Sequence, residues 1–496
     1  MDHQEKPLPH VLIFPLPIQS PVNSMLKLAE LLCLAGLHVT FLNTKHNHKR
    51  LLRYTNVQSR LAQYGGRFHI ETVEDGLPED SHTVEQFAEI LDSLQSVAEP
   101  LLRELLKGGG SSGTSDGKSK PPITCIIAEG LYYYAVDVAE EMGIPIILFE
   151  TISPCCVWVY LCVAKLIEAG ELPFKGYDLD APVTSIPGME GLLRCRDLPE
   201  FCRRDSPAKR NAELAMAGAR NIPRVAGLIL NTFEVLEGHF LHHIKSQARD
   251  VYTIGPLQLH LKTRLAAHKI EVPDLSNSLW AEDTSCLTWL DSQPMKSVIY
   301  ISFGSLTNLT NDEFMEFWQG IINSGQRFLW VIRPGSIKGK ELGHDEFLKE
   351  LSKGTNEMGL ILSWVRQEEV IKHPAIGGFL THSGWNSTLE SIIGGVPMIC
   401  WPHYVDQLVT SRFVSEMWKI GLDMKDTCDR SIIEKMVRDV MERKYEFDES
   451  GEKLSKLAKE SVVEGGSSHI DLERLVQDIK RLSIEGFSNG KSLQLN

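Results

Sequence analysis

Residues 11–32 read VLIFPLPIQSPVNSMLKLAELL, and this stretch decides the fold of the first half of the chain. Residues 11–14 form a short apolar run typical of a buried strand, and Pro15 and Pro17 end it. From Met25 onward, apolar side chains recur at helical spacing. The stretch therefore predicts a strand, a loop and a helix, which is the repeating unit of a parallel sheet covered by helices.

The same strand signal recurs along the chain. Continuous apolar runs rich in β-branched residues are typical of strands that helices cover on both faces. Such runs occupy residues 39–42, 124–128, 146–149 and 227–230, and later residues 297–303, 328–332, 360–363, 378–381 and 397–399. Helical patterns between them predict an α/β protein with two Rossmann-like, doubly wound domains. Ligands of such folds bind outside the carboxyl ends of the strands, so we expect a site in a cleft between the domains.

Length and composition agree with two domains, because 496 residues with 43% hydrophobic content can build two separate cores. We predict an N-terminal, acceptor-binding domain over 1–255 and a C-terminal, donor-binding domain over 294–470. An interdomain linker over 256–293, which lacks a sustained period, would join them. The final helix and tail, 471–496, would pack back on the N-terminal domain. Residues 108–120, rich in Gly, Ser and Lys, predict a surface loop.

Charge and cysteine content exclude several classes of protein. The net charge of −14 is spread along the chain, so no basic stripe offers a nucleic-acid footprint. Ten scattered cysteines without a CxxC pair argue against a zinc site and a disulfide framework, and favour a reducing cytoplasm. We see no secretion signal and no apolar run of the length that a membrane span needs. A cytoplasmic monomer is expected.

The most specific motif lies in the second half of the chain. Residues 364–407 read WVRQEEVIKHPAIGGFLTHSGWNSTLESIIGGVPMICWPHYVDQ. Within this box, residues 385–391 open a predicted helix, whose N-terminal N–H groups and dipole suit an anion. His382, Asn386 and Ser387 add neutral hydrogen-bonding groups around that helix end. We therefore expect a diphosphate to bind here without a metal ion.

The box closely resembles the signature of plant family-1 UDP-dependent glycosyltransferases, which have the two-domain GT-B fold. The residues that match the family pattern at the family spacing are Trp364, Gln367, His373, His382, Gly384, Trp385, Asn386, Ser387, Glu390, Pro397, Asp406 and Gln407. Similarity extends over most of the chain, including residues 14–17, 254–256 and 302–305. The resemblance implies a glucosyltransferase with UDP-glucose as donor, no metal, and a small hydrophobic plant metabolite as acceptor.

The resemblance also implies roles for individual donor-site residues. Trp364 would stack on the uracil, Glu390 would accept hydrogen bonds from the ribose hydroxyls, and Asp406 with Gln407 would hold the sugar, with Gln407 favouring glucose. The full donor site would comprise Ser305, Trp364, Gln367, His382, Trp385, Asn386, Ser387, Glu390, Asp406 and Gln407. His373 is interpreted as structural.

The residues expected to drive the chemistry are replaced. In the family, a catalytic histidine follows Gln-Gly in the first loop, whereas this chain reads Gln19-Ser20-Pro21. Pro21 cannot accept a proton. The aspartate that orients the family's histidine is here Glu129, which keeps the charge on a longer side chain. The fold tolerates the change, because Ser20 would serve as an N-cap and Pro21 as a first helical residue.

Three functions remain open. The protein transfers sugar, with Glu129 as the base or with an acceptor that is already acidic, such as a carboxylic acid or an enol. Alternatively, the fold catalyses another reaction on a small metabolite, or it binds without catalysis. The acceptor is expected near Gln19, Glu129, residues 132–134 and the apolar residues 152–161. The sequence as a whole resembles those of family members that act on terpenoid or iridoid aglycones.

Overall fold

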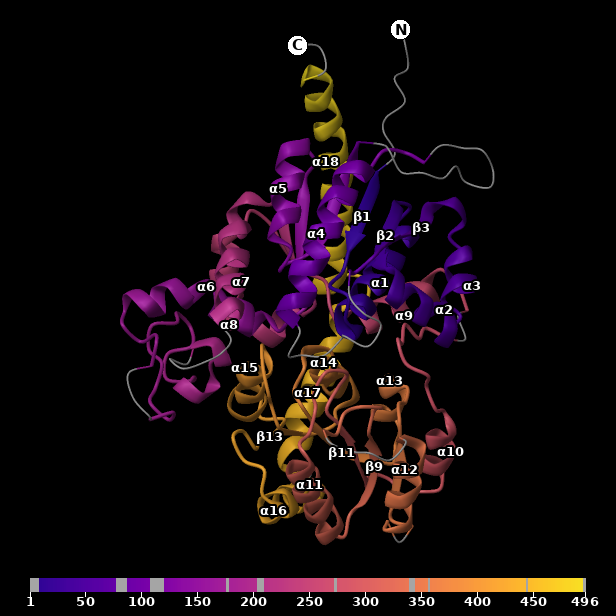
Figure 1. Ribbon diagram of the computed structural model, residues 1–496, viewed down its shortest axis with the longest axis vertical. Coiled ribbons are helices and arrows are strands. Elements are labelled where there is room, and N and C mark those ends of the chain that lie inside the picture. Colours follow the sequence, from indigo (N-terminus) through magenta and orange to yellow (C-terminus); the bar gives the residue numbers. More distant parts are fainter. Residues whose placement is uncertain are drawn as a thin grey trace. The chain divides into compact units, whose positions relative to one another are not determined.

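The computed structural model describes residues 9–76, 87–107, 120–174, 178–202, 209–271, 274–338, 344–355, 357–442 and 445–493. The chain divides into two compact units (Figure 1). The first comprises residues 1–164, 207–279 and 460–496, and the second comprises residues 165–206 and 280–459. The predicted surface loop at 108–120 lies, except for Lys120, outside the described residues.

The first unit is built on a seven-stranded parallel sheet in the order β3-β2-β1-β4-β5-β6-β7. Its strands are β1 (His10–Phe14), β2 (His38–Thr44), β3 (Phe68–Val73), β4 (Cys125–Glu129), β5 (Ile146–Glu150), β6 (Gly227–Leu230) and β7 (Val251–Thr253). The strand order reverses between β1 and β4, where Phe14 pairs with Ala128. The loops after these two strands therefore flank the switch point, where ligands of such sheets bind.

Ten helices among the described residues cover this sheet or extend from it. They are α1 (Gln19–Leu34), α2 (Lys45–Tyr54), α3 (Val57–Ala62), α4 (Phe87–Leu106), α5 (Tyr133–Met142), α6 (Pro154–Glu168), α7 (Lys209–Asn221), α8 (Glu234–Gln247), α9 (Leu257–Ala267) and α18 (Ser467–Leu493). Helix α18 is bonded to the sheet, because Asp471 accepts from the Thr253 backbone N–H (2.8 Å) and Ser483 bonds Thr124 (2.8 Å). The C-terminal helix thus belongs to the first unit.

The second unit contains a six-stranded parallel sheet in the order β10-β9-β8-β11-β12-β13. Its strands are β8 (Val298–Ser302), β9 (Arg327–Val331), β10 (Gly359–Leu362), β11 (Ile376–Thr381), β12 (Met398–Cys400) and β13 (Gly421–Asp423). Its helices are α10 (Ser285–Asp291), α11 (Asn311–Ser324), α12 (His344–Lys353), α13 (Gln367–Ile371), α14 (Trp385–Gly394), α15 (Gln407–Arg412) and α16 (Arg430–Glu442), with α17 (Tyr445–Ser461) at its end. Two doubly wound parallel sheets confirm the predicted fold class.

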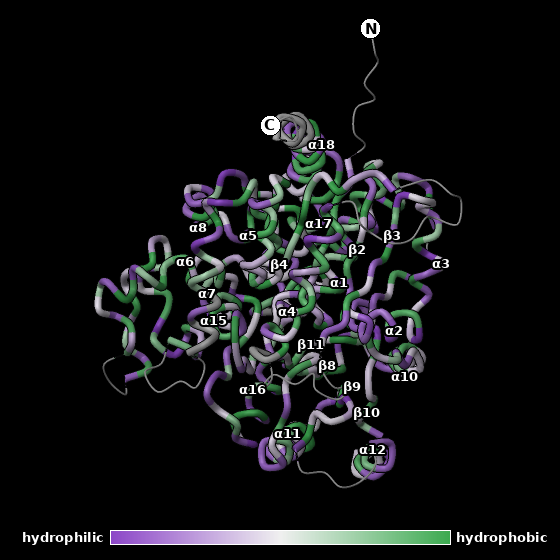
Figure 2. The backbone as a smooth tube through the Cα atoms, turned by 45° about the horizontal axis from the view of Figure 1, so that its top comes forward, coloured by the Kyte–Doolittle hydropathy of each residue, from purple (hydrophilic) through white to green (hydrophobic). Residues whose placement is uncertain are grey.

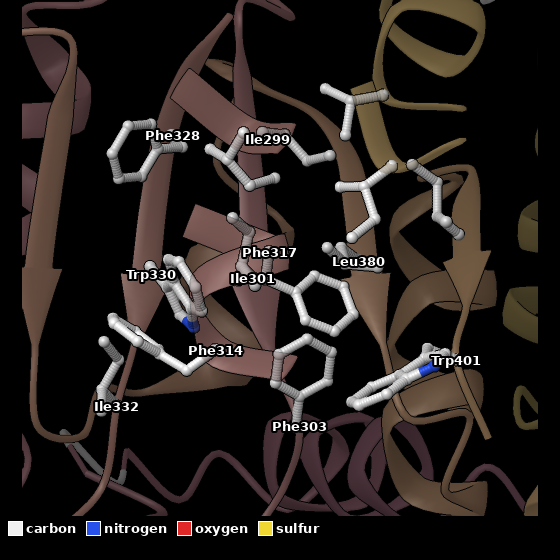
Figure 3. Close-up of a cluster of buried hydrophobic side chains, with 14 of the residues drawn as sticks. Ile299, Ile301, Phe303, Phe314, Phe317, Phe328, Trp330, Ile332, Leu380 and Trp401 are labelled. Carbon is white, nitrogen blue, oxygen red and sulfur yellow. The ribbon is translucent and has the colours of Figure 1, made fainter. Parts of the chain in front are cut away.

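Large aromatic side chains form the core of the second unit (Figure 3). Phe303, Phe317 and Trp401 pack with ring centroids 4.5–5.3 Å apart. Trp330 on β9 and Phe314 on α11 extend the cluster, with their ring centroids 5.5 Å apart. In Figure 2, by contrast, helix α12 carries many hydrophilic residues. This packing holds the carboxyl ends of the strands in place.

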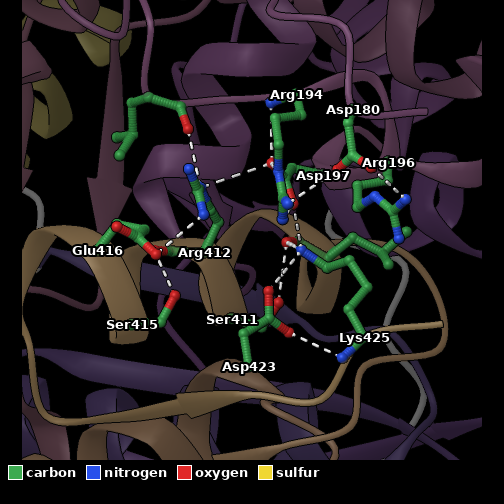
Figure 4. Close-up of polar contacts among 12 residues, drawn as sticks. Asp180, Arg194, Arg196, Asp197, Ser411, Arg412, Ser415, Glu416, Asp423 and Lys425 are labelled. Atoms are coloured by element: carbon green, nitrogen blue, oxygen red, sulfur yellow. Dashed lines mark hydrogen bonds and ion pairs between the residues drawn. The ribbon is translucent and has the colours of Figure 1, made fainter. Parts of the chain in front are cut away.

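Residues 165–206 belong to the second unit, whereas the sequence-based limits placed them in the N-terminal domain. A buried ion cluster holds them there (Figure 4). The fully buried Asp197 carboxylate pairs with Lys425 Nζ at 2.6 Å and with Arg194 Nε at 3.0 Å. Arg412 on α15 donates to the backbone oxygen of Leu192. The region predicted as a linker, 256–293, also contains ordered helices, namely α9 and α10.

Candidate active site

The loop after β1 leads directly into α1, whose first turn contains Pro21. Ile18 is the N-cap, and its backbone oxygen accepts the first helical bond from the Val22 N–H at 3.2 Å. The predicted N-cap Ser20 is therefore wrong, because the chain becomes helical two residues earlier. Pro21 is the third helical residue, where an N–H would have no helical partner. Proline thus fits the fold at this position, and its buried ring carries no group that could move a proton.

Gln19, which we expected near the acceptor, is bonded to the segment that precedes the second unit. Its Nε2 donates to the Asn277 backbone oxygen at 3.1 Å, and its Oε1 accepts from the Leu279 N–H at 2.7 Å. Arg60 donates to the Asn277 side chain, which in turn donates to Asn23 Oδ1 at 3.3 Å. These bonds fix the start of α1, and both polar groups of Gln19 are used in doing so.

Glu129 ends β4 next to the switch point of the first sheet. Its side chain is 2% exposed. Oε2 accepts from the Leu131 N–H at 2.8 Å, and Oε1 accepts from the Thr151 hydroxyl at 3.1 Å. Burial raises the pKa of Glu129 to about 7, although both hydrogen bonds oppose the shift. A carboxyl group with such a pKa can exchange a proton near neutral pH.

The aromatic residues after Glu129 are mostly packed inside the first unit. Tyr132 stacks on Phe14, with ring centroids 4.4 Å apart, and donates its hydroxyl to the Pro15 backbone oxygen at 3.0 Å. Tyr134 is also buried, and the Tyr133 hydroxyl donates to Gln95 Oε1 at 2.6 Å. Tyr132 therefore joins the loops after β1 and β4.

In the second unit, Gln367 connects two of the predicted donor-site residues. Its Oε1 accepts from the Tyr300 hydroxyl at 3.1 Å. Its Nε2 donates to Ser387 Oγ at 2.8 Å and to Glu390 Oε2 at 2.6 Å. Gln367 begins α13, while Ser387 and Glu390 lie in the first turns of α14. The structure thus brings these three predicted residues together at the N-terminal end of α14.

His382 lies just before α14 and is closely surrounded by backbone. A Cβ added at Gly304 or at Gly384 would lie 2.5 Å from its Nε2, so both positions require glycine for this approach. Burial, with a smaller contribution from His403, lowers the pKa of His382 to about 3. Its imidazole is therefore neutral at physiological pH. Ser305, predicted to bind the donor, follows Gly304 directly and is partly buried.

Trp385 and Asn386 begin α14. The Trp385 side chain is 2% exposed and lies near Trp418, with ring centroids 6.1 Å apart. Because this side chain is buried, only the backbone of Trp385 can contact a ligand. The first N–H groups of α14 have no partner within the helix and are available for such a contact. Asn386 is partly buried. The ring of His373 bonds the side chain of Asp291, the last residue of α10, at 3.2 Å. His373 stays interpreted as a structural residue.

Asp406 is the N-cap of α15 and Gln407 is its first residue, and both are buried. Gln407 Oε1 accepts from the backbone N–H groups of His403 at 2.9 Å and Tyr404 at 3.3 Å. The orientation of the Gln407 amide is therefore set by the turn before the helix. No group of three or more His, Cys, Asp or Glu side chains among the described residues is arranged to hold a metal ion.

Trp364 has an aromatic neighbour that sequence reasoning missed. Its ring centroid lies 5.8 Å from that of Trp280, with the rings inclined at 33°. The Asp283 N–H donates to the Trp364 backbone oxygen at 2.9 Å, and Glu282 pairs with Arg366 at 3.0 Å. Residues 280–283 thus support the loop that carries Trp364. The sequence signal for this role is weak, because only proximity in the fold relates the two tryptophans.

The two units together define a class of protein. Each is a doubly wound parallel sheet, the second with a glycine-lined helix N-terminus and converging polar side chains, as in proteins that bind nucleotides. A family model for UDP-glucoronosyl and UDP-glucosyl transferases matches residues 272–465. The chain is 52% identical over 487 residues to a 7-deoxyloganetic acid glucosyltransferase of Catharanthus roseus, covering 98% of this chain and 100% of that protein. The chain therefore belongs to the UDP-glycosyltransferase family, which confirms the predicted family and enzyme class.

Other relatives agree. A myricetin 3-O-rhamnoside 1,2-glucosyltransferase of Crocosmia x crocosmiiflora is 41% identical, with 97% of both chains covered. The crystal structure of Os79 from O. sativa in complex with UDP matches with a TM-score of 0.75 and 27% identity, covering 95% of this chain and all of that one. The donor of this family is a UDP-sugar. No helix among the residues that the structure describes is long and apolar enough to cross a membrane.

Proposed function

We propose that this protein is a glucosyltransferase that transfers glucose from UDP-glucose to a small hydrophobic aglycone of the iridoid or a related terpenoid class. The observation that carries the proposal is the 52% identity to the 7-deoxyloganetic acid glucosyltransferase over 98% of this chain and 100% of that protein. Two 7-deoxyloganetin glucosyltransferases, from Catharanthus roseus and Gardenia jasminoides, are each 38% identical. We further propose that the protein works as a cytoplasmic monomer.

On the donor side, Trp364 would stack on the uracil and Glu390 would accept from the ribose hydroxyls. The Gln367 amide, which donates to Glu390 at 2.6 Å, would hold that carboxylate in position. Asp406 and Gln407 would bind the sugar hydroxyls. These roles are supported by the order of the residues in the box, by the bond between Glu390 and Gln367, and by the positions of Asp406 and Gln407 at the start of α15.

The diphosphate would be bound by neutral donors and without a metal ion. The low pKa of His382 makes its imidazole neutral, so it would contribute a hydrogen bond and no net charge. The first N–H groups of α14 and the dipole of that helix would add further stabilisation of the anion. The donor box contains no Asp-x-Asp spacing that would suit a bridging cation.

On the acceptor side, a carboxyl group would perform the role that a histidine has elsewhere in the family. The acceptor oxygen attacks the anomeric carbon, the bond to the diphosphate breaks, and UDP leaves with the bonding electrons. The proton of an acceptor hydroxyl needs a base, and Glu129 is the titratable group that remains at the replaced pair. An acceptor carboxylate would need none.

The test is turnover of UDP-glucose by the purified protein in EDTA, with 7-deoxyloganetic acid, 7-deoxyloganetin and simple phenols as acceptors. Glucoside formation with an iridoid, retained in EDTA, is the expected result. A Trp364→Ala/Glu390→Ala double variant should lose UDP binding in isothermal titration, while Glu350→Gln on the exposed face of α12 serves as the matched control. Binding of UDP without any turnover would contradict the proposal, and so would an obligatory requirement for Mg²⁺ or Mn²⁺.

A further inference from the structure

A second glutamate lies beside Glu129 at the carboxyl edge of the first sheet. Glu129 ends β4 and Glu150 ends β5, and the two strands are parallel neighbours in which Glu129 pairs with Phe149. The pairing continues past the strand end, because the Gly130 N–H donates to the Phe149 backbone oxygen at 3.3 Å. Both carboxylates therefore emerge from the sheet at the same edge, next to the switch point between β1 and β4.

Gly130 leaves room for the Glu150 carboxylate beside the end of β4. A Cβ added at Gly130 would lie 2.1 Å from Glu150 Oε1 and 2.6 Å from Oε2. The Glu150 carboxylate thus lies directly over the residue that follows Glu129, in space that any other side chain would fill. Helix α7 also lies close to this point, since a Cβ at Gly218 would lie 3.4 Å from the Gly130 backbone oxygen.

The two carboxylates differ in how firmly they are held. Glu129 is buried, and each of its oxygens accepts a hydrogen bond, one from the Leu131 N–H and one from the Thr151 hydroxyl. Thr151 follows Glu150 directly, so the same turn places both glutamates. Glu150 itself is partly exposed. A molecule bound at this edge can reach Glu150 more readily than Glu129.

The electrostatic surroundings favour retention of a proton by the pair. Burial raises the pKa of both carboxyls, and the charge of Glu129 raises the pKa of Glu150 further, to about 8. No cation contributes to either shift. Among the titratable side chains near the pair is Tyr132, whose own pKa is raised by burial and by the charges of Tyr134 and Glu129. Two such carboxyls titrate as a unit around neutral pH.

We propose that Glu129 and Glu150 form a carboxyl pair that replaces the family's histidine and aspartate, with Glu150 as the catalytic residue that takes the proton of an acceptor hydroxyl. Glu129 is then the positioning residue, since its own oxygens are engaged by Leu131 and Thr151. In the transfer step, the acceptor oxygen bonds to the anomeric carbon while the bond to UDP breaks. The hydroxyl proton moves to Glu150 and later to solvent. This inference rests on the proposed glucosyl transfer to a hydroxyl.

The experiment compares Glu150→Gln, Glu150→Asp and Glu129→Gln with the unaltered protein. Glu104→Gln, on the exposed side of α4 in the same unit, is the matched control. We expect Glu150→Gln to lower kcat with a hydroxyl acceptor by about 10²-fold, the scale of general-base help, with the KM for UDP-glucose unchanged. Glu150→Asp should restore part of the loss. In the unaltered protein, kcat should rise with pH through the titration of the pair, and Glu150→Gln should flatten that rise.

A second readout does not depend on turnover. Infrared difference spectra recorded between pH 6 and pH 9 should show loss of a protonated carboxyl band in the unaltered protein and in Glu104→Gln. The loss should be smaller in Glu150→Gln, where Glu129 alone still titrates. Absence of turnover by the unaltered protein would overturn the proposed function, and the proposed catalytic role with it, while the infrared band still decides whether the pair exists. Turnover that Glu150→Gln leaves unchanged, with an unchanged pH profile, would overturn the pair alone. Unfolding temperatures of all variants show whether any loss reflects misfolding.

Discussion

Gln367 Nε2 lies 2.6 Å from Glu390 Oε2, so the first residue of α13 holds the carboxylate of α14 by a charge-assisted hydrogen bond. The same amide also contacts Ser387 Oγ at 2.8 Å, and the Tyr300 hydroxyl fixes its other end. The amide thus has one orientation in which all three partners are satisfied. Glu390 is thereby pre-oriented before any ligand arrives, which lowers the cost of ordering it on binding.

The first prediction concerns this amide. Gln367→Ala removes the donor from Glu390 and should raise the Kd for UDP by about tenfold, which corresponds to roughly 1.4 kcal/mol. Gln367→Glu should weaken binding further, because two carboxylates would then face each other. Isothermal titration with UDP measures both. Glu350→Gln, an exposed residue of α12, is the control, and equal affinities for Gln367→Ala and this control would rule out the proposed role.

A second prediction follows from the support of Trp364 by Trp280. Trp280→Ala leaves Trp364 without its aromatic neighbour, so the ring should gain freedom and the KM for UDP-glucose should rise several-fold. The value of kcat should change less, since the reacting atoms are not contacted. Trp280→Phe keeps a ring at this position and should restore most of the affinity. If the alanine and phenylalanine variants have the same KM, aromatic support is not what Trp280 provides.

The sequence predicts some parts of this molecule well and others not at all. Strands such as β1 and β8 were recognisable because continuous apolar runs reflect burial on both faces. Helix α9 was missed, since it lacks an amphipathic period, and His260 and Gln258 are buried together with its leucines. The family box predicted Gln367 and Glu390 because its spacing is specific. Glu150 could not be predicted, since its approach to Glu129 depends on strand pairing and on the missing Cβ of Gly130.

The third prediction concerns the stability of the ion cluster around Asp197. Burial disfavours the Asp197 carboxylate, but hydrogen bonds from Arg194 and the charge of Lys425 outweigh burial and lower the pKa of Asp197. A lowered pKa in the folded state stabilises the protein above the unfolded pKa of Asp. That contribution is lost as pH falls through the folded value. Asp197→Asn should therefore reduce the free energy of unfolding by roughly 3 kcal/mol at pH 7, and by much less in acid.

Chemical denaturation at pH 7 and near pH 3 measures this difference. Asp180→Asn is the matched control, because Asp180 also pairs with Arg194 but is 60% exposed and should contribute little. Equal destabilisation by the two substitutions would contradict the special role of the buried carboxylate. A loss for Asp197→Asn that does not shrink in acid would contradict the sign of its pKa shift.

The last prediction restores the family's catalytic pair. Pro21→His combined with Glu129→Asp should raise glucosylation of alcohol and phenol acceptors by about tenfold or more, because an alcohol attacks poorly near neutral pH without a positioned base. Pro21 is the third residue of α1, so its replacement breaks no helical hydrogen bond. Acceptors that react through a carboxylate should gain nothing, since they carry no proton to remove.

Initial rates with paired hydroxyl and carboxylic acid acceptors, each measured in the double variant and in both single variants, test this prediction. A gain on hydroxyl acceptors alone would show that the native site lacks an effective imidazole base. Should the unaltered protein already match the double variant on simple alcohols and keep that rate in Glu129→Gln, no carboxyl at residue 129 is needed for proton transfer.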